Sequence, residues 1–288
     1  MSVRFTVTAV LSLAVLTGCG SQPAAGPVPG STATPAQSAG TQADRQIQQI
    51  KADCMKQKGF TYIPFVRPPL KETETQRKME EGDLDAMREF RAKYGYQVFA
   101  AHVYPDDLAS GAFVEEAIPA DPNDRYRGSL NETQFNAYKE ADQACFGKAV
   151  KEVLHKTSSA EMNYLMQRLD MIKRLKEREL DGDPKIAELA VPFGDCLKSK
   201  GYPVPSLKPT AMARRGMEAF RAEEAKFGPG ENGSIPDLTA DQARPYLARE
   251  IKDALDDLEC GKDFYAAYTP KEREIKLRVT REFGEVNG

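Results

Sequence analysis

The sequence predicts a mainly α-helical protein with two similar disulfide-stapled units, joined by a long helix and preceded by a disordered linker. Three observations lead to this prediction. Apolar residues recur at three- and four-residue steps, helix-capping patterns precede those stretches, and one pattern of segments occurs twice. Alternation typical of a strand extends no further than Tyr96 to His102.

Residues 1–18 have the three parts of a bacterial export signal. Arg4 lies in a short n-region, an apolar stretch follows, and Leu16-Thr17-Gly18-Cys19 closes the segment as a lipobox. The apolar stretch is shorter than the roughly 20 residues that a membrane-spanning helix needs, so we expect the segment to be removed. In the lipoprotein pathway that this motif resembles, cleavage falls before Cys19, and Cys19 carries diacylglycerol. The segment therefore predicts a lipid anchor on the extracytoplasmic face of the cell membrane.

Residues 19–44 are expected to be the lipidated cysteine and a flexible linker. From Gly20 to Asp44 there is no aromatic residue, and the one charge stands at the end. As a coil, this segment would span about 25–30 Å, which holds the folded part a short distance from the membrane.

The folded part contains an internal repeat. Cys54-Met55-Lys56-Gln57-Lys58-Gly59-Phe60 matches Cys196-Leu197-Lys198-Ser199-Lys200-Gly201-Tyr202, and both read as a helix that ends with lysines and a C′ glycine. Further matches are Lys93-Tyr94-Gly95 with Lys226-Phe227-Gly228, the capping boxes at Asn131 and Thr239, and Asp142-x-x-Cys145 with Asp257-x-x-Cys260. We therefore expect one helical unit at 45–156 and a second at 184–288.

Four cysteines remain once Cys19 is assigned to the lipid, and an even number outside the cytoplasm is expected to pair. Of the three possible connectivities, the order of the repeat favours Cys54 with Cys145 and Cys196 with Cys260. The sequence contains no Cys-x-x-Cys motif, so we interpret both bridges as structural.

Residues 157–183 are predicted to hold the connecting helix. Ser158 and Glu161 form a capping-box pattern, and six apolar residues then recur along one face as far as about Leu180: Met162, Leu165, Met166, Leu169, Ile172 and Leu175. We favour a helix packed between the units over a partner-binding helix. Asp183-Pro184 is expected to begin the next helix, and Thr269-Pro270 the last one.

The charge pattern argues against nucleic acid as a partner. Loss of Arg4 with the export signal changes the formal net charge from −3 to −4, and no basic block is present.

Signatures of catalysis and of cofactor binding are absent from the sequence, so we predict no catalytic residue, no cofactor and no metal site. His102 and His155 are the only histidines, too few for a zinc site without other ligands. Acidic residues gather at Asp106-Asp107, Glu115-Glu116 and Asp121 to Asp124. We interpret them as solvated turns rather than as an acid/base pair or a calcium site.

Aromatic residues are dense between Tyr94 and Tyr104. Tyr94, Tyr96, Phe99 and Tyr104, together with Lys93 and nearby carboxylates, form a possible ligand patch for sugar or peptide. The alternative is that these rings fill the core of a small helical unit, which we favour. This patch is still the best candidate site that the sequence offers.

The motifs of the first unit resemble those of a family of secreted actinobacterial lipoproteins with no assigned activity. The resemblance rests on Cys54-Met55 with Gly59-Phe60, on Tyr94-Gly95-Tyr96, and on Asp121-Pro122-Asn123 leading to Tyr126, Ser129-Leu130, Tyr138 and Cys145. Gln97 stands where that family continues with glycine. The resemblance implies the envelope location and the cysteine role, and it implies no catalytic residue.

Together these observations predict a non-catalytic interaction or structural role at the cell envelope, with an envelope protein or a cell-wall component as partner. The alternative is a ligand-binding protein for a wall fragment, a peptide or a cation, using the Tyr94–Tyr104 patch or a cleft between the units. A third hypothesis is an envelope hydrolase that uses the carboxylates between Asp106 and Asp124.

Overall fold

The computed structural model describes residues 35–67, 72–114, 120–230 and 235–283, and in that part it is helical with no strand. The export signal and Cys19 lie outside the described residues. The helices, in chain order, are α1 (Pro35–Gln57), α2 (Glu74–Glu80), α3 (Leu84–Tyr94), α4 (Ala100–Val103), η1 (Leu108–Ser110), α5 (Asp124–Ser129), α6 (Glu132–Leu154), α7 (Glu161–Glu179), α8 (Pro184–Ser199), α9 (Pro209–Glu224), η3 (Ala225–Phe227), α10 (Ala240–Cys260) and α11 (Lys262–Phe283). None of the described helices combines the length and apolarity needed to cross a membrane.

Both predicted disulfides are confirmed. Cys54 on α1 is bonded to Cys145 on α6, and Cys196 on α8 to Cys260 on α10, with Cα–Cα distances of 5.6 and 5.5 Å. Each bridge therefore joins the two cysteine-bearing helices of one repeat, and in the second copy α11 follows them.

The repeat has the same local geometry in both copies. Gly59 and Gly201 have φ of 84° and 85°, a left-handed conformation that suits glycine. The next residue donates its N–H back into the last turn, from Phe60 to Met55 O and from Tyr202 to Leu197 O, each at 3.0 Å. The two cysteine helices thus end in the same C-cap, as their sequences predict.

Most predicted helix starts are correct. Asn131 and Thr239 form full capping boxes with Gln134 and Gln242, and Asp183 caps α8 with Pro184 in its first turn.

The expected capping box at Ser158 is wrong. The N-cap of α7 is Ala160. Glu161 Oε1 instead forms an ion pair with Lys51 Nζ at 3.3 Å, and Ser158 Oγ donates a hydrogen bond to Ala160 O. The expected start of the last helix at Thr269 is also wrong, because Pro270 lies inside α11. Buried residues on both sides of this proline, including Tyr268 and Ile275, hold the helix against the core despite the missing N–H.

The predicted end of the linker needs correction as well. The linker was expected to continue to Asp44, whereas α1 begins at Pro35. Proline is compatible with the first turn of a helix, the segment is rich in Ala and Gln, and Asp44 is already buried. The last ten residues of the predicted linker are therefore helical.

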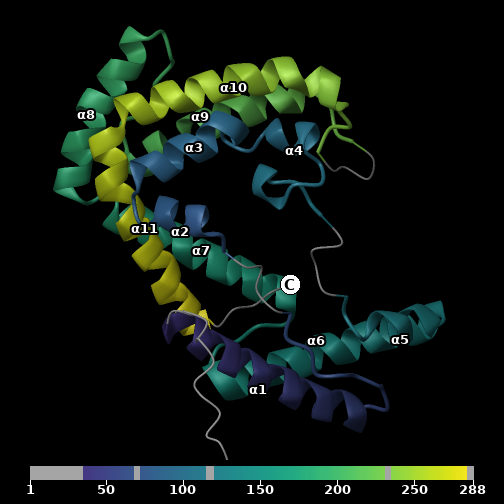
Figure 1. The fold of residues 1–288 in the computed structure, drawn as a ribbon. Helices are drawn as coiled ribbons and strands as arrows, with labels where there is room; N and C mark the ends of the chain where they lie inside the picture. The colour runs from purple at the N-terminus through teal and green to yellow at the C-terminus, as the bar shows by residue number, and fades with distance from the viewer. Residues whose placement is uncertain (1–34, 68–71, 115–119, 231–234, 284–288) are drawn as a thin grey trace, which may run out of the picture. The chain divides into compact units, whose positions relative to one another are not determined.

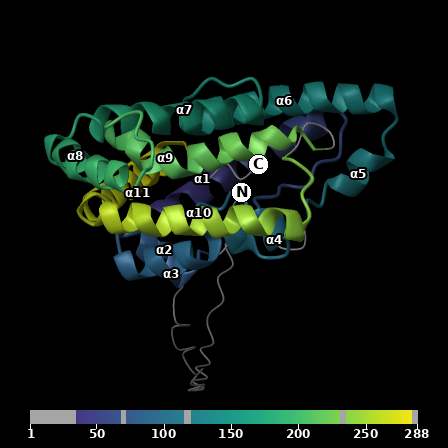
Figure 2. The same ribbon diagram turned by 90° about the horizontal axis from the view of Figure 1, so that it is seen from above.

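Residues 34–288 form one compact unit. α1 packs on α6 and α11, whereas α3 and α4 pack on α10 (Figures 1 and 2). α3 and α4 lie between Cys54 and Cys145 in the sequence, yet they pack against a helix of the second half of the chain. α10 is therefore covered by α3 and α4 as well as by α9.

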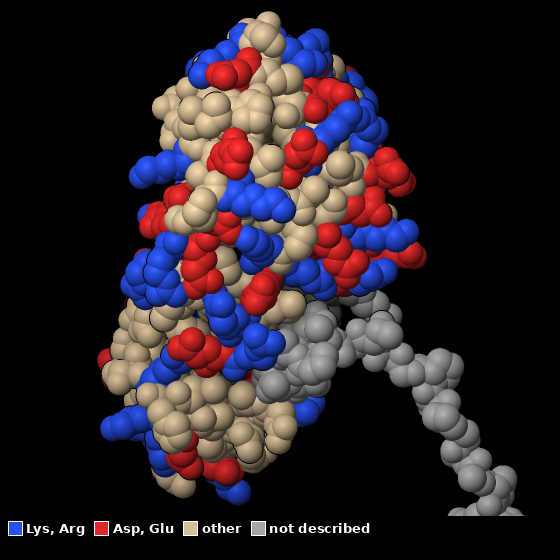
Figure 3. Space-filling view, turned by 90° about the vertical axis from the view of Figure 1, so that its left-hand side faces the viewer, with Lys and Arg blue, Asp and Glu red and all other residues tan. Residues whose placement is uncertain are grey.

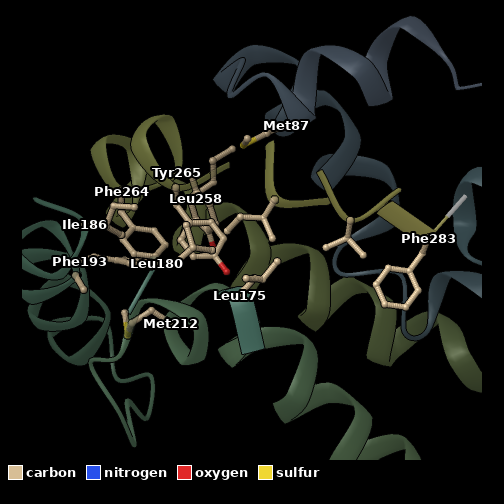
Figure 4. Packing of buried hydrophobic residues seen from close by; sticks show 14 of the residues in the cluster. Met87, Leu175, Leu180, Ile186, Phe193, Met212, Leu258, Phe264, Tyr265 and Phe283 are labelled. Atoms are coloured by element: carbon tan, nitrogen blue, oxygen red, sulfur yellow. The ribbon is translucent and has the colours of Figure 1, made fainter. Parts of the chain in front are cut away.

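The main core extends along α11, from α8 at one end to α1, α6 and α7 at the other. At the α8 end, Ile186, Phe193 and Phe264 point toward one another, with Leu258 and Tyr265 beside them (Figure 4). On the face shown in Figure 3, acidic and basic side chains are interspersed, so that face presents no large field of one sign.

Candidate functional site

The predicted aromatic patch lies mainly in a second core cluster. Tyr94 and Phe99 are buried, and Tyr96 and Tyr104 are half-buried around them. The Phe99 ring stacks on Tyr246 of α10, with ring centroids 4.9 Å apart. These rings therefore fill the space between α3, α4 and α10, which is the core-packing interpretation of this segment.

The tyrosine hydroxyls of the patch have partners inside the protein. Tyr94 donates to Asp107 at 2.6 Å and Tyr96 donates to Asp253 at 2.7 Å. Burial, with the negative charge of Asp257, raises the pKa of Tyr96 well above its ordinary value. Tyr96 thus stays a neutral donor that ties the α3–α4 connection to α10.

A buried carboxylate holds the same connection from the other side. Glu250 of α10 is fully buried and accepts backbone N–H groups from Tyr96, Val98 and Phe99 at 2.7, 2.9 and 2.8 Å. Burial raises the pKa of Glu250, and the three N–H donors oppose that rise. Gly95 is needed here because a Cβ at this position would lie 2.7 Å from Glu250 Cγ.

A buried ion network continues along α10. Arg91 of α3 lies 2.8 Å from Asp257, whose carboxylate also accepts a hydrogen bond from Tyr265 at 2.6 Å. Arg215 of α9 pairs with Asp253 and approaches Asp257 at 3.3 Å. Two arginines from different halves of the chain therefore meet two aspartates of one helix, so each buried charge has a counter-charge.

The ion network borders a cavity with a volume of about 600 Å³. Side chains of α2, α3, α9 and α11 form most of its wall. The apolar members are Met79, Met87, Phe90, Leu108, Ala109, Ala213, Tyr265 and Tyr268. A cavity of this size with a mainly apolar wall has the form of a site for a small organic molecule.

The charged groups of the cavity wall are paired. Arg91 is held by Asp257, Arg214 lies 3.3 Å from Glu218, and Glu80 lies 3.6 Å from Lys276. Glu272 pairs with Lys176 and Lys276, and Glu72 lies 3.8 Å from Arg273. The wall therefore presents apolar surface together with charges that are already neutralised.

A second, polar pocket of about 230 Å³ lies beside the first disulfide. Its buried cation, Lys51, is 2.9 Å from Asp142 and stacks over the Tyr62 ring at 4.7 Å. Asn123 joins the segment before α5 to the segment after α1: its Oδ1 accepts from Ile63 N–H at 2.7 Å and its Nδ2 donates to Ile63 O at 3.0 Å. The Asp-Pro-Asn motif is thus a structural clamp.

The carboxylates considered for catalysis have other partners. Asp107 accepts from Tyr94 and Lys93, and Asp121 and Asp124 both bind Arg127. Glu115 and Glu116 lie outside the described residues. His102 Nε2 is 2.7 Å from Glu224, and no described group of three or more His, Cys, Asp or Glu side chains is arranged to hold a metal ion.

Sequence reasoning used Asp257 only as part of the repeat and missed the buried network that the acidic residues of α10 form. Glu250, Asp253 and Asp257 recur at steps of three and four, on the same face as Leu247, Ala254 and Leu258. Carboxylates on the apolar face of an amphipathic helix were the available signal for a buried network. Their partners Arg91 and Arg215 are more than 30 residues away in the chain, so spacing alone could not assign them.

Comparison of the chain with protein-family models, with curated proteins and with solved structures finds no match. The function must therefore be argued from the geometry of the molecule.

Proposed function

We propose that the protein is a non-catalytic binding protein of the cell envelope, anchored through a lipid on Cys19, which holds a small ligand with an apolar body. The observation that carries this proposal is the cavity of about 600 Å³ between α2, α3, α9 and α11. Its volume lies within the range of roughly 300–1,000 Å³ that is usual for small-molecule sites.

The chemistry of the wall supports an uncharged ligand body. Met79, Met87 and Phe90 offer deformable or aromatic apolar surface, and thioethers adapt to irregular shapes. A formal charge placed beside Arg91 or Glu272 would compete with ion pairs that already exist. An apolar chain or ring system would bury surface without disturbing them.

The proposed location is supported by the cysteines and the lipobox. Disulfides such as Cys54–Cys145 persist in oxidising compartments, which agrees with export. We expect Cys19→Ala to abolish incorporation of labelled palmitate in producing cells and to move the protein from the membrane fraction to the soluble fraction. Retention of the label by this variant would refute the anchor.

The cavity can be tested by filling it. Ala213 lines the cavity from α9, so Ala213→Phe places a ring inside it, whereas Ala219→Phe puts the same ring on the exposed side of the same helix. With Nile red as an uncharged fluorescent probe, we expect Ala213→Phe to weaken binding at least about tenfold, because the apolar surface of the site is no longer available. The Ala219→Phe variant should bind Nile red like the unaltered protein.

Two results would refute the proposed cavity function. One is the absence of any Nile red binding by the unaltered protein. The other is an equal loss of binding in both variants while their thermal unfolding temperatures stay the same.

A further inference from the structure

An apolar row on α7 is open to solvent. Met162, Met166 and Leu169 have exposed fractions of 61, 50 and 48%. They are spaced by four and three residues and therefore share one face of the helix. The other side of α7 packs against the core, where its residues Tyr164 and Leu175 are buried. The helix is therefore held in place while the apolar row faces solvent.

The connecting helix is therefore packed on one side only. The sequence predicted one apolar face, and the structure divides it, because Leu175 enters the core while the three residues of the apolar row stay outside. Large apolar side chains that are exposed side by side, rather than scattered, mark a surface that contacts something else.

A small basic pocket lies at the end of the apolar row. Its volume is about 160 Å³, and it is lined by Leu169, Ile172, Lys173, Lys176, Glu177, Thr210 and Arg214. Its three cations have partners: Lys173 lies 4.0 Å from Glu177, Lys176 pairs with Glu272, and Arg214 lies 3.3 Å from Glu218. The side chains of Lys173 and Arg214 are 65 and 46% exposed, so their charges reach solvent beside the apolar row.

The shape and charge of this surface favour a lipid bilayer as the partner. An amphipathic helix from another protein would need a groove, whereas the three residues of the apolar row form a ridge on the outside of α7. A bilayer interface accepts such a ridge among its acyl chains, and exposed lysines and arginines attract anionic head groups.

The proposed lipid anchor would keep this surface near the bilayer. The chain from Cys19 to Pro35 can reach at most about 55 Å when fully extended. A contact that is weak by itself would then be formed for a larger fraction of the time, because the anchor raises the local concentration of the bilayer.

We propose that α7 is a membrane-contact surface. Met162, Met166 and Leu169 insert at the level of the head groups, while Lys173 and Arg214 bind phosphates of anionic lipids. This contact shares Arg214 with the wall of the cavity but does not require a ligand there.

The test uses residues 34–288, the compact unit that holds both disulfides but lacks Cys19. Sedimentation is measured with vesicles of phosphatidylglycerol and phosphatidylcholine in equal amounts, and with phosphatidylcholine alone. We expect binding to the anionic vesicles that weakens in high salt. Lys173→Gln should weaken it about fivefold, and Met166→Ser about tenfold.

A matched control comes from α8. Val191 is 47% exposed, so Val191→Ser removes a comparable apolar side chain elsewhere and should leave vesicle binding unchanged. Met166→Ser should leave Nile red binding to the cavity unchanged, because Met166 does not line it, and this separates failure of this proposal from failure of the cavity proposal. Because the altered side chains are exposed, unfolding temperatures should stay close to that of the unaltered protein.

Three results would overturn the proposal: equal sedimentation with both kinds of vesicle, equal loss of binding for Met166→Ser and Val191→Ser, or light scattering that shows a dimer lost in Met166→Ser without vesicle binding. The last result would assign the row to a second copy of the chain.

Discussion

Gly216 of α9 offers a sharp test of how the two halves of the chain are joined. A Cβ at this position would overlap the end of the Tyr96 ring, so Gly216→Ala must displace that ring. Displacement breaks the hydrogen bond from Tyr96 to Asp253 and the contact of Arg215 with the Tyr96 hydroxyl. Loss of a hydrogen bond to a charged group costs about 1.5–3 kcal/mol, and overpacking adds about 1–3 kcal/mol.

Helix propensity acts in the opposite direction. Alanine stabilises the interior of a helix by about 1 kcal/mol relative to glycine. We therefore expect Gly216→Ala to lower the free energy of unfolding by about 1.5–5 kcal/mol after this gain is subtracted. Urea unfolding followed by circular dichroism measures the difference, and an unchanged slope would show that both proteins unfold to similar states.

Two further variants test whether the Tyr96 ring causes this loss of stability. Gly128→Ala places a Cβ in open space within α5, so it should be neutral or slightly stabilising. In a Tyr96→Ala background, Gly216→Ala should lose its cost, because the ring that it displaces is gone. Additive effects of Tyr96→Ala and Gly216→Ala would refute the proposed contact.

Two other predictions concern stability. Replacing Cys196 and Cys260 together by serine opens a loop with a sequence separation of 64 and should cost about 4 kcal/mol in urea unfolding, whereas an unchanged unfolding midpoint would argue against a structural bridge. Asp256 accepts hydrogen bonds from Lys200, Lys252 and Tyr202, which hold its pKa below the ordinary value. Its ionised form therefore stabilises the fold above about pH 4, and this stabilisation is lost as the pH falls through the lowered value. Asp256→Asn should be less stable than the unaltered protein at pH 7, with a smaller difference at pH 2.5, and a difference independent of pH would contradict this assignment.

Much of the fold could be predicted because its signals are local. Asn131 and Thr239 begin α6 and α10 through side chains that reach only three residues along the chain. Gly59 and Gly201 end two other helices, α1 and α8, through their own backbone conformation. The cysteine pairing followed from the repeat, since each pair joins the two cysteine-bearing helices of one copy. The lipid anchor at Cys19, the envelope location and the family resemblance remain predictions from the sequence.

The candidate site was not predictable in the same way. The sequence suggested an aromatic patch because four rings lie within eleven residues: Tyr94, Tyr96, Phe99 and Tyr104. Packing against α10 places most of that aromatic surface inside the protein. The cavity takes its wall from four helices that are far apart in the chain, so no single segment carries its signature.

By itself, the amino-acid sequence determined the helical class, the starts of α6, α8 and α10 and the two disulfides, because these depend on short-range hydrogen bonds and on an internal repeat. Only the tertiary structure decided that Arg91 and Arg215 meet on α10, and that the apolar face of α7 is divided between core and solvent. Periodicity shows which residues share a face of a helix. What covers that face depends on long-range packing, where the burial of each apolar group competes with the desolvation of the charges beside it.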